Sequence, residues 1–90
     1  MYRPFPEVGG DGRFVLEEKS MIDMMATGKK IQALKEKAGI TVKEMQNVFG
    51  FASPYPIYKW QNGQNLPTLD NLVILAGLFG VKMDDIVVVK

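Results

Sequence analysis

The sequence predicts an all-α fold, a compact five-helix bundle formed by a single domain. Apolar residues recur at three- and four-residue intervals from residue 27 onward, which is the period of helices with one buried face. Thr or Ser residues precede these segments and Gly residues follow them, as is typical of helix starts and stops. A chain of 90 residues with an apolar fraction of 47% can bury one small core, so one domain is expected.

The first helix is expected over residues 27–38. Thr27 is the expected N-cap, and Gly39 suits the left-handed residue that ends a helix. Ile31, Leu34 and Ala38 fall on one face at helical spacing. This face is therefore predicted to be buried.

The second helix is expected over residues 41–50. Thr41 and Glu44 match a capping box, in which each side chain accepts a hydrogen bond from the free backbone N–H of the other residue. Gly50 ends the helix, and Phe51 and Ala52 form a tight corner. The residues predicted to be buried are Met45, Val48 and Phe49.

The third helix is expected from Pro54 to about Asn62, with Ser53 as its N-cap. Pro54 and Pro56 are compatible with its first turn, because the backbone N–H groups there have no acceptor within the helix. The residues that mark its buried side and its end are Ile57, Trp60 and Gly63.

The fourth helix is expected over residues 68–79, with Thr68 as N-cap and Gly80 at its end. Apolar residues cover more than half of its surface, which predicts the central helix of the core. They are Leu69, Leu72, Val73, Leu75, Ala76, Leu78 and Phe79. In the tail, Asp84 and Asp85 favour the start of a short fifth helix, whereas the valines at 87–89 favour an extended end.

Residues 1–20 are expected to be an N-terminal extension, flexible or forming an accessory strand, ahead of a domain at residues 21–90. Pro4, Pro6 and the glycine-rich run at 9–12 break any helical period, which leaves residues 13–18 as a candidate strand. Two glutamate codons just before Met21 would form a purine-rich ribosome-binding sequence if both were GAG. We therefore expect translation to start at Met21.

The composition argues against an enzyme, a metalloprotein and a membrane protein. The chain has no Cys and no His, which removes thiolate chemistry, the usual zinc ligands and the commonest general base. The longest apolar run, residues 72–81, is ten residues long, and a membrane helix needs about 20. No catalytic residue, metal, cofactor or small-molecule ligand is expected, and the cytoplasm is the expected location.

The net charge of +1 hides an uneven distribution along the chain. Residues 28–63 carry six basic and two acidic side chains. Residues 1–27 carry three basic and five acidic side chains, and residues 64–90 carry two basic and three acidic ones. The positive charge is concentrated over the first three expected helices, where it favours contact with a polyanion. The four lysines of the first helix are more simply explained as a solvated helix surface.

Residues 21–88 resemble the phage-repressor-like helix-turn-helix proteins, the Cro/C1-type or XRE-family transcriptional regulators. The motifs that carry the resemblance follow one another at domain-wide spacing. They are Gly28-Lys29-Lys30-Ile31, Gly39-Ile40-Thr41, Phe49-Gly50-Phe51, Ile57-Tyr58-Lys59-Trp60-Gln61-Asn62-Gly63, Leu66-Pro67-Thr68-Leu69-Asp70-Asn71-Leu72 and Leu78-Phe79-Gly80-Val81 with Asp84-Asp85-Ile86. The resemblance implies a five-helix, lambda-repressor-like DNA-binding domain that inserts its third helix in the major groove.

The resemblance also implies which residues contact double-stranded DNA. Those at the start of the second helix, where the family touches phosphates, are Thr41, Val42 and Lys43. Those on the recognition-helix face are Ser53, Pro54, Tyr55, Pro56, Tyr58 and Lys59, and those in the following loop are Asn62, Gly63 and Gln64. The expected function is a sequence-specific transcriptional regulator. A homodimer is expected to form through an edge at residues 87–89 or 13–18.

Three departures from the family pattern leave a second function open. Val42 replaces a common glutamine, Tyr55 and Pro56 replace short polar or alanine residues, and the interval from Gly50 to Ile57 is one residue longer. Tyrosines offer one hydroxyl each and apolar contact to thymine methyls, which reads sequence more weakly than a bidentate side chain. The alternative is an antitoxin-like or adaptor protein-interaction module, which would use an aromatic patch of Phe51, Tyr55 and Tyr58.

Overall fold

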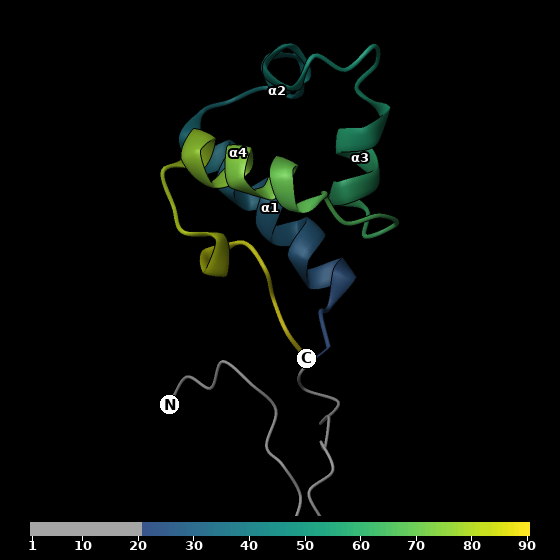
Figure 1. Ribbon diagram of the computed structural model, residues 1–90, viewed down its shortest axis with the longest axis vertical. Coiled ribbons are helices and arrows are strands. Elements are labelled where there is room, and N and C mark those ends of the chain that lie inside the picture. The colour runs from purple at the N-terminus through teal and green to yellow at the C-terminus, as the bar shows by residue number, and fades with distance from the viewer. Residues whose placement is uncertain (1–20) are drawn as a thin grey trace, which may run out of the picture.

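The computed structural model describes residues 21–90. Within that range the chain forms four α-helices and one turn of 3-10 helix (Figure 1). They are α1 (Met24–Ala38), α2 (Val42–Phe49), α3 (Tyr55–Gln61), α4 (Leu69–Phe79) and the turn η2 (Met83–Asp85). The all-α prediction is confirmed, but the prediction of five helices is wrong, because the expected fifth helix is only this single turn. The candidate strand at 13–18 and the start at Met21 concern residues 1–20, which lie outside the described range.

Helix α1 begins one turn earlier than the sequence predicted. Asp23 is its N-cap, and the carboxylate accepts a hydrogen bond from the N–H of Ala26 at 3.0 Å. Thr27 lies inside the helix and is only 1% exposed. Its hydroxyl accepts a hydrogen bond from the N–H of Val88 at 3.0 Å, so Thr27 ties α1 to the C-terminal tail. The predicted end at Gly39 is confirmed, with a φ of 71°.

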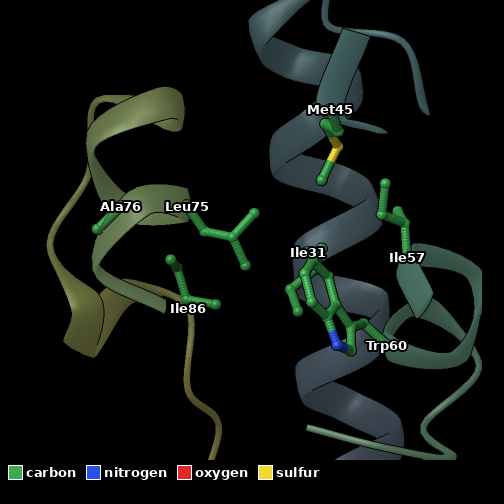
Figure 2. Packing of buried hydrophobic residues seen from close by; sticks show 7 residues of the cluster. All are labelled: Ile31, Met45, Ile57, Trp60, Leu75, Ala76 and Ile86. Carbon is green, nitrogen blue, oxygen red and sulfur yellow. The ribbon is translucent and has the colours of Figure 1, made fainter. Parts of the chain in front are cut away.

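One apolar core holds the helices together. Its buried members are Ile31, Met45, Ile57, Trp60, Leu75, Ala76 and Ile86. Figure 2 shows Ile31 of α1 in the middle, with Leu75 and Ile86 on one side and Ile57 on the other, and the ring of Trp60 overlaps Ile31 in this view. Helix α1 contacts both α3 and α4, so it is the central helix of the domain.

Helix α4 is therefore not the central helix that its composition predicted. Leu75 and Ala76 are buried, but Leu69 and Val73 are 72% and 54% exposed. The main partners of α4 are α1 and η2, and these cover only one side of it. The prediction that Val48 of α2 is buried is also wrong, since its side chain is 52% exposed. The main partner of α2 is α3, which covers only one side of α2.

Two glycines let α1 lie directly against the end of α3. A Cβ atom at Gly28 would lie 2.3 Å from the carbonyl oxygen of Trp60 and 2.6 Å from that of Gln61. Gly63, at φ 74°, would bring a Cβ atom within 2.9 Å of the Cα of Met25. Only residues without a side chain allow this approach, so the two glycines fix where α3 ends relative to α1.

The C-terminal tail returns to the start of α1 (Figure 1). The N–H of Asp23 donates to the carbonyl of Val88, and the N–H of Lys90 donates to that of Met21, both at 2.8 Å. Ile22 and Val89 form an antiparallel bridge, which confirms the extended end predicted for residues 87–89. No helix within residues 21–90 combines the length and the apolar character needed to cross a membrane.

Candidate nucleic-acid interface

The capping box predicted at the start of α2 is present. The Thr41 hydroxyl accepts a hydrogen bond from the N–H of Glu44 at 3.0 Å, and the Glu44 carboxylate accepts one from the N–H of Thr41 at 3.1 Å. The hydroxyl still has its own proton to donate to another acceptor. Lys43, in the first turn, is exposed. The start of α2 therefore presents one hydroxyl donor and one ammonium group to solvent.

Three aromatic rings, which we call the aromatic triad, fix the crossing of α2 and α3. Phe49, at the end of α2, stacks on Phe51 of the corner with ring centroids 5.2 Å apart. Trp60 of α3 meets Phe49 and Phe51 edge-on, at 5.3 and 5.8 Å. These are favourable aromatic geometries. The corner is thus a packed element: Phe49 and Trp60 lie on the predicted buried sides of their helices, and Phe51, expected only to form the corner, packs against both.

Polar groups complete the corner between the two helices. Gly50 adopts a φ of 70°, which ends α2 as predicted. The side-chain amide of Gln46 donates a hydrogen bond to the carbonyl of Phe51 at 3.2 Å. Ser53 precedes α3, and its hydroxyl accepts a hydrogen bond from the N–H of Tyr55 at 3.3 Å. The N-cap position itself is Pro54, one residue after the predicted Ser53. Gln46 was missed because its partner is a backbone carbonyl beyond the helix.

The outer face of α3 carries four polar or aromatic side chains at helical spacing. Tyr55, Tyr58, Lys59 and Asn62 follow at intervals of three and four residues, so they lie on one side of the helix. Ile57 and Trp60 lie on the buried side. The Lys59 ammonium lies 5.4 Å from the centroid of the Tyr55 ring, within the range of a cation–π contact.

A shallow hollow, which we call the α3 hollow, opens at the start of this face. It is lined by Ser53, Pro54, Tyr55 and Tyr58, has a volume of about 240 Å³ and presents apolar atoms. Sites for drug-sized ligands usually measure about 300–1,000 Å³ and enclose the ligand. The α3 hollow is smaller and open, so it suits one protruding group rather than a whole small molecule.

The predicted DNA-contacting residues divide into two groups by exposure. The exposed ones are Thr41, Lys43, Ser53, Tyr55, Tyr58, Asn62 and Gln64. The half-buried ones are Val42, Pro54, Pro56, Lys59 and Gly63. Val42 packs against the core, so much of its side chain is unavailable to a ligand. Phe51 packs in the same way, which removes it from the aromatic patch expected with Tyr55 and Tyr58.

Across residues 21–90, no group of three or more His, Cys, Asp or Glu side chains is arranged to hold a metal ion. The side chains that gather around α3 are amides, hydroxyls, aromatic rings and one ammonium group. This chemistry suits hydrogen bonding, apolar contact and charge neutralisation.

Solved DNA-binding domains share this fold at low sequence identity. The crystal structure of the DNA-binding domain of BldD superposes with a TM-score of 0.60 and 18% identity, covering 71% of this chain and 92% of that one. The S. venezulae BldD DNA-binding domain superposes with a TM-score of 0.60 and 18% identity, covering 71% of this chain and 94% of that one. No protein-family model matches the chain, and no curated protein sequence is significantly similar to it.

A regulator of restriction-modification has the same arrangement of helices. The controller protein C.AhdI from Aeromonas hydrophila superposes with a TM-score of 0.63 and 17% identity, covering 71% of this chain and 96% of that one. Nearly the whole of each compared domain is therefore matched. The chain has the helix-turn-helix fold of these proteins, which confirms, for the fold, its resemblance to the Cro/C1-type helix-turn-helix regulators.

Proposed function

We propose that the chain is a sequence-specific DNA-binding transcriptional regulator that inserts α3 in the major groove of double-stranded DNA. The observation that carries the proposal is the outer face of α3, where Tyr55, Tyr58, Lys59 and Asn62 project from a helix braced by the aromatic triad. The major groove admits an α-helix, and a fixed crossing angle holds such a helix in register.

The charge distribution supports the same proposal. Residues 45–69 contain no Asp or Glu, so α3 and both its flanking loops carry no charge that would repel phosphates. In the proposed complex Lys43 and Lys59 neutralise phosphates, and the Thr41 hydroxyl donates a hydrogen bond to one. Tyr55 and Tyr58 meet base edges or sugars, while residues 62–64 approach the backbone.

A homodimer on paired half-sites extends the proposal. The backbone at residues 87–89, expected to pair between copies, already pairs in part with residues 21–23 of the same chain. Helix α4 instead offers an exposed apolar surface. Its members are Leu69, Val73 and Ile74 of α4, which are 72%, 54% and 41% exposed, and Leu66 of the loop before α4, which is 36% exposed. Burying such a surface against a second copy would remove apolar area from water.

The central experiment is selection of binding sites from a random pool of double-stranded DNA, using the full 90-residue chain. The proposal expects an enriched motif, repeated in inverted orientation about one helical turn apart if the dimer forms. DNA binding would be refuted if no motif is enriched from the pool and the protein does not retard DNA in a gel at low salt. A motif without a repeat, together with a monomer mass by light scattering at high concentration, would refute the dimer alone.

A protein-interaction module, antitoxin-like or adaptor, is the second candidate function. The observation that favours it is the exposure of Tyr55 and Tyr58, at 66% and 45%, beside Pro54. Exposed tyrosines are common in protein interfaces. One observation counts against it: Phe51 is half-buried against the core, so the exposed patch is small. Failure of DNA binding in the selection experiment, with Tyr55→Ala abolishing capture of a protein partner, would favour this function.

A further inference from the structure

The α3 hollow is an apolar part of the outer face of α3, so hydrogen bonding to base edges does not account for it. It lies beside the first turn of the helix, between Pro54 and the rings of Tyr55 and Tyr58. Pro54 has no N–H to donate, and the Ser53 hydroxyl, which accepts the N–H of Tyr55, keeps only its own proton to donate. The walls therefore offer apolar surface and no amide or guanidinium group, which are the side-chain groups that read bases by paired hydrogen bonds.

We infer that the α3 hollow receives the C5-methyl group of a thymine in the major groove. This inference rests on the proposed function and names the base edge that α3 reads. Thymine is the one ordinary base that presents a methyl group there, and apolar side-chain contact is its usual mode of recognition. An open hollow of about 240 Å³ suits a methyl group that protrudes from a base edge.

The positive charge beside the α3 hollow favours DNA, which carries phosphates, over an apolar protein segment as the group that enters the hollow. The Lys59 ammonium, 5.4 Å from the Tyr55 ring centroid, lies beside one wall of the hollow. The nearest acidic residues in the sequence are Glu44 and Asp70, outside α3 and its flanking loops. A group that enters the hollow therefore meets an apolar surface with a cation at its edge, which matches a base methyl next to a phosphate.

The inference is tested by replacing thymines with deoxyuridine, one at a time, in the selected DNA site. Deoxyuridine keeps every hydrogen-bonding group of thymidine and lacks only the methyl. Replacing one particular thymine in each half-site with deoxyuridine should lower the DNA affinity of the full chain about fourfold, because one buried methyl group is lost. This measurement uses the unaltered protein, so it does not depend on a variant that folds.

Two variants of Tyr55, which is 66% exposed, assign the effect to the hollow. Tyr55→Ala should make thymine and deoxyuridine bind equally at the sensitive position, whereas Tyr55→Phe should keep the fourfold ratio because it keeps the ring. As a control, Lys43→Ala should weaken binding to both DNAs by the same factor and leave the ratio unchanged.

The outcomes separate this inference from the proposed function. DNA binding with equal affinity for thymine and deoxyuridine at every position would overturn the inference and leave the proposed function standing. Loss of the ratio in Tyr55→Phe would also overturn it, because the hydroxyl rather than the apolar ring would then be the reader. No binding to any DNA would refute the proposed function itself.

Discussion

Gly28 and Trp60 are in contact through their backbones: a Cβ atom on Gly28 would lie 2.3 Å from the Trp60 carbonyl oxygen. The contact joins the first turns of α1 to the last turn of α3. The obstacle is backbone, which cannot rotate away as the end of a flexible side chain can. The close approach of α1 to the last turn of α3 therefore requires that residue 28 has no side chain.

Gly28→Ala should destabilise the domain by about 2 kcal/mol, because α1 and α3 must separate to admit the methyl. Gly77 in α4 provides a matched control, since nothing lies within 4 Å of a Cβ atom there. Gly77→Ala should stabilise by about 0.5–1 kcal/mol through helix propensity alone. Urea denaturation of the two variants measures both values. Equal effects of the same sign would contradict the close approach of α1 and α3.

Thr27→Val should destabilise by about 1–3 kcal/mol, because it leaves the N–H of Val88 without the Thr27 hydroxyl as acceptor. Valine has nearly the same shape as threonine, so packing is preserved. Thr27→Ser keeps the hydroxyl and removes only a methyl group. Hydrogen exchange distinguishes the two variants: the Val88 amide should exchange faster in Thr27→Val and remain protected in Thr27→Ser. Unchanged protection in Thr27→Val would show that this amide has another acceptor.

Sequence reasoning succeeded where the signal was local. The capping box of Thr41 and Glu44 involves residues three apart, and the ends of α1, α2 and α4 at Gly39, Gly50 and Gly80 need only a positive φ. All of these were predicted correctly. A helix end is fixed by the backbone groups next to it, so a short stretch of sequence contains the necessary information.

Sequence reasoning failed where the partner is distant in the sequence. Thr27 is a residue type that often caps helices, but its hydroxyl accepts a hydrogen bond from the N–H of Val88, which is 61 residues away. Helix α4 is apolar enough for a central position, yet which of its sides is covered depends on where α1 lies. In the candidate interface, the residues of the α3 face were expected from the family resemblance, whereas the α3 hollow depends on how Ser53, Pro54 and two tyrosines pack, which neither spacing nor the resemblance specifies.

Thr41→Ala should destabilise by about 1 kcal/mol, because the N–H of Glu44 loses its acceptor and the capping box loses its reciprocal half. Thr41→Ser keeps the hydroxyl and should be close to neutral. Thermal denaturation followed by circular dichroism measures both variants. An equal loss in the serine variant would indicate that the methyl group, rather than the cap, contributes the stability.

Lys59→Ala should flatten the dependence of DNA affinity on salt. Each phosphate neutralised by a side chain adds about one unit to the slope of log affinity against log salt concentration. Lys82 is a suitable control, because it precedes η2, which packs on α4. Fluorescence anisotropy with the selected DNA, from low to moderate salt, should give a slope smaller by about one unit for Lys59→Ala and an unchanged slope for Lys82→Ala. If both variants keep the original slope, Lys59 does not contact a phosphate, and α3 enters the groove without charge neutralisation at that position.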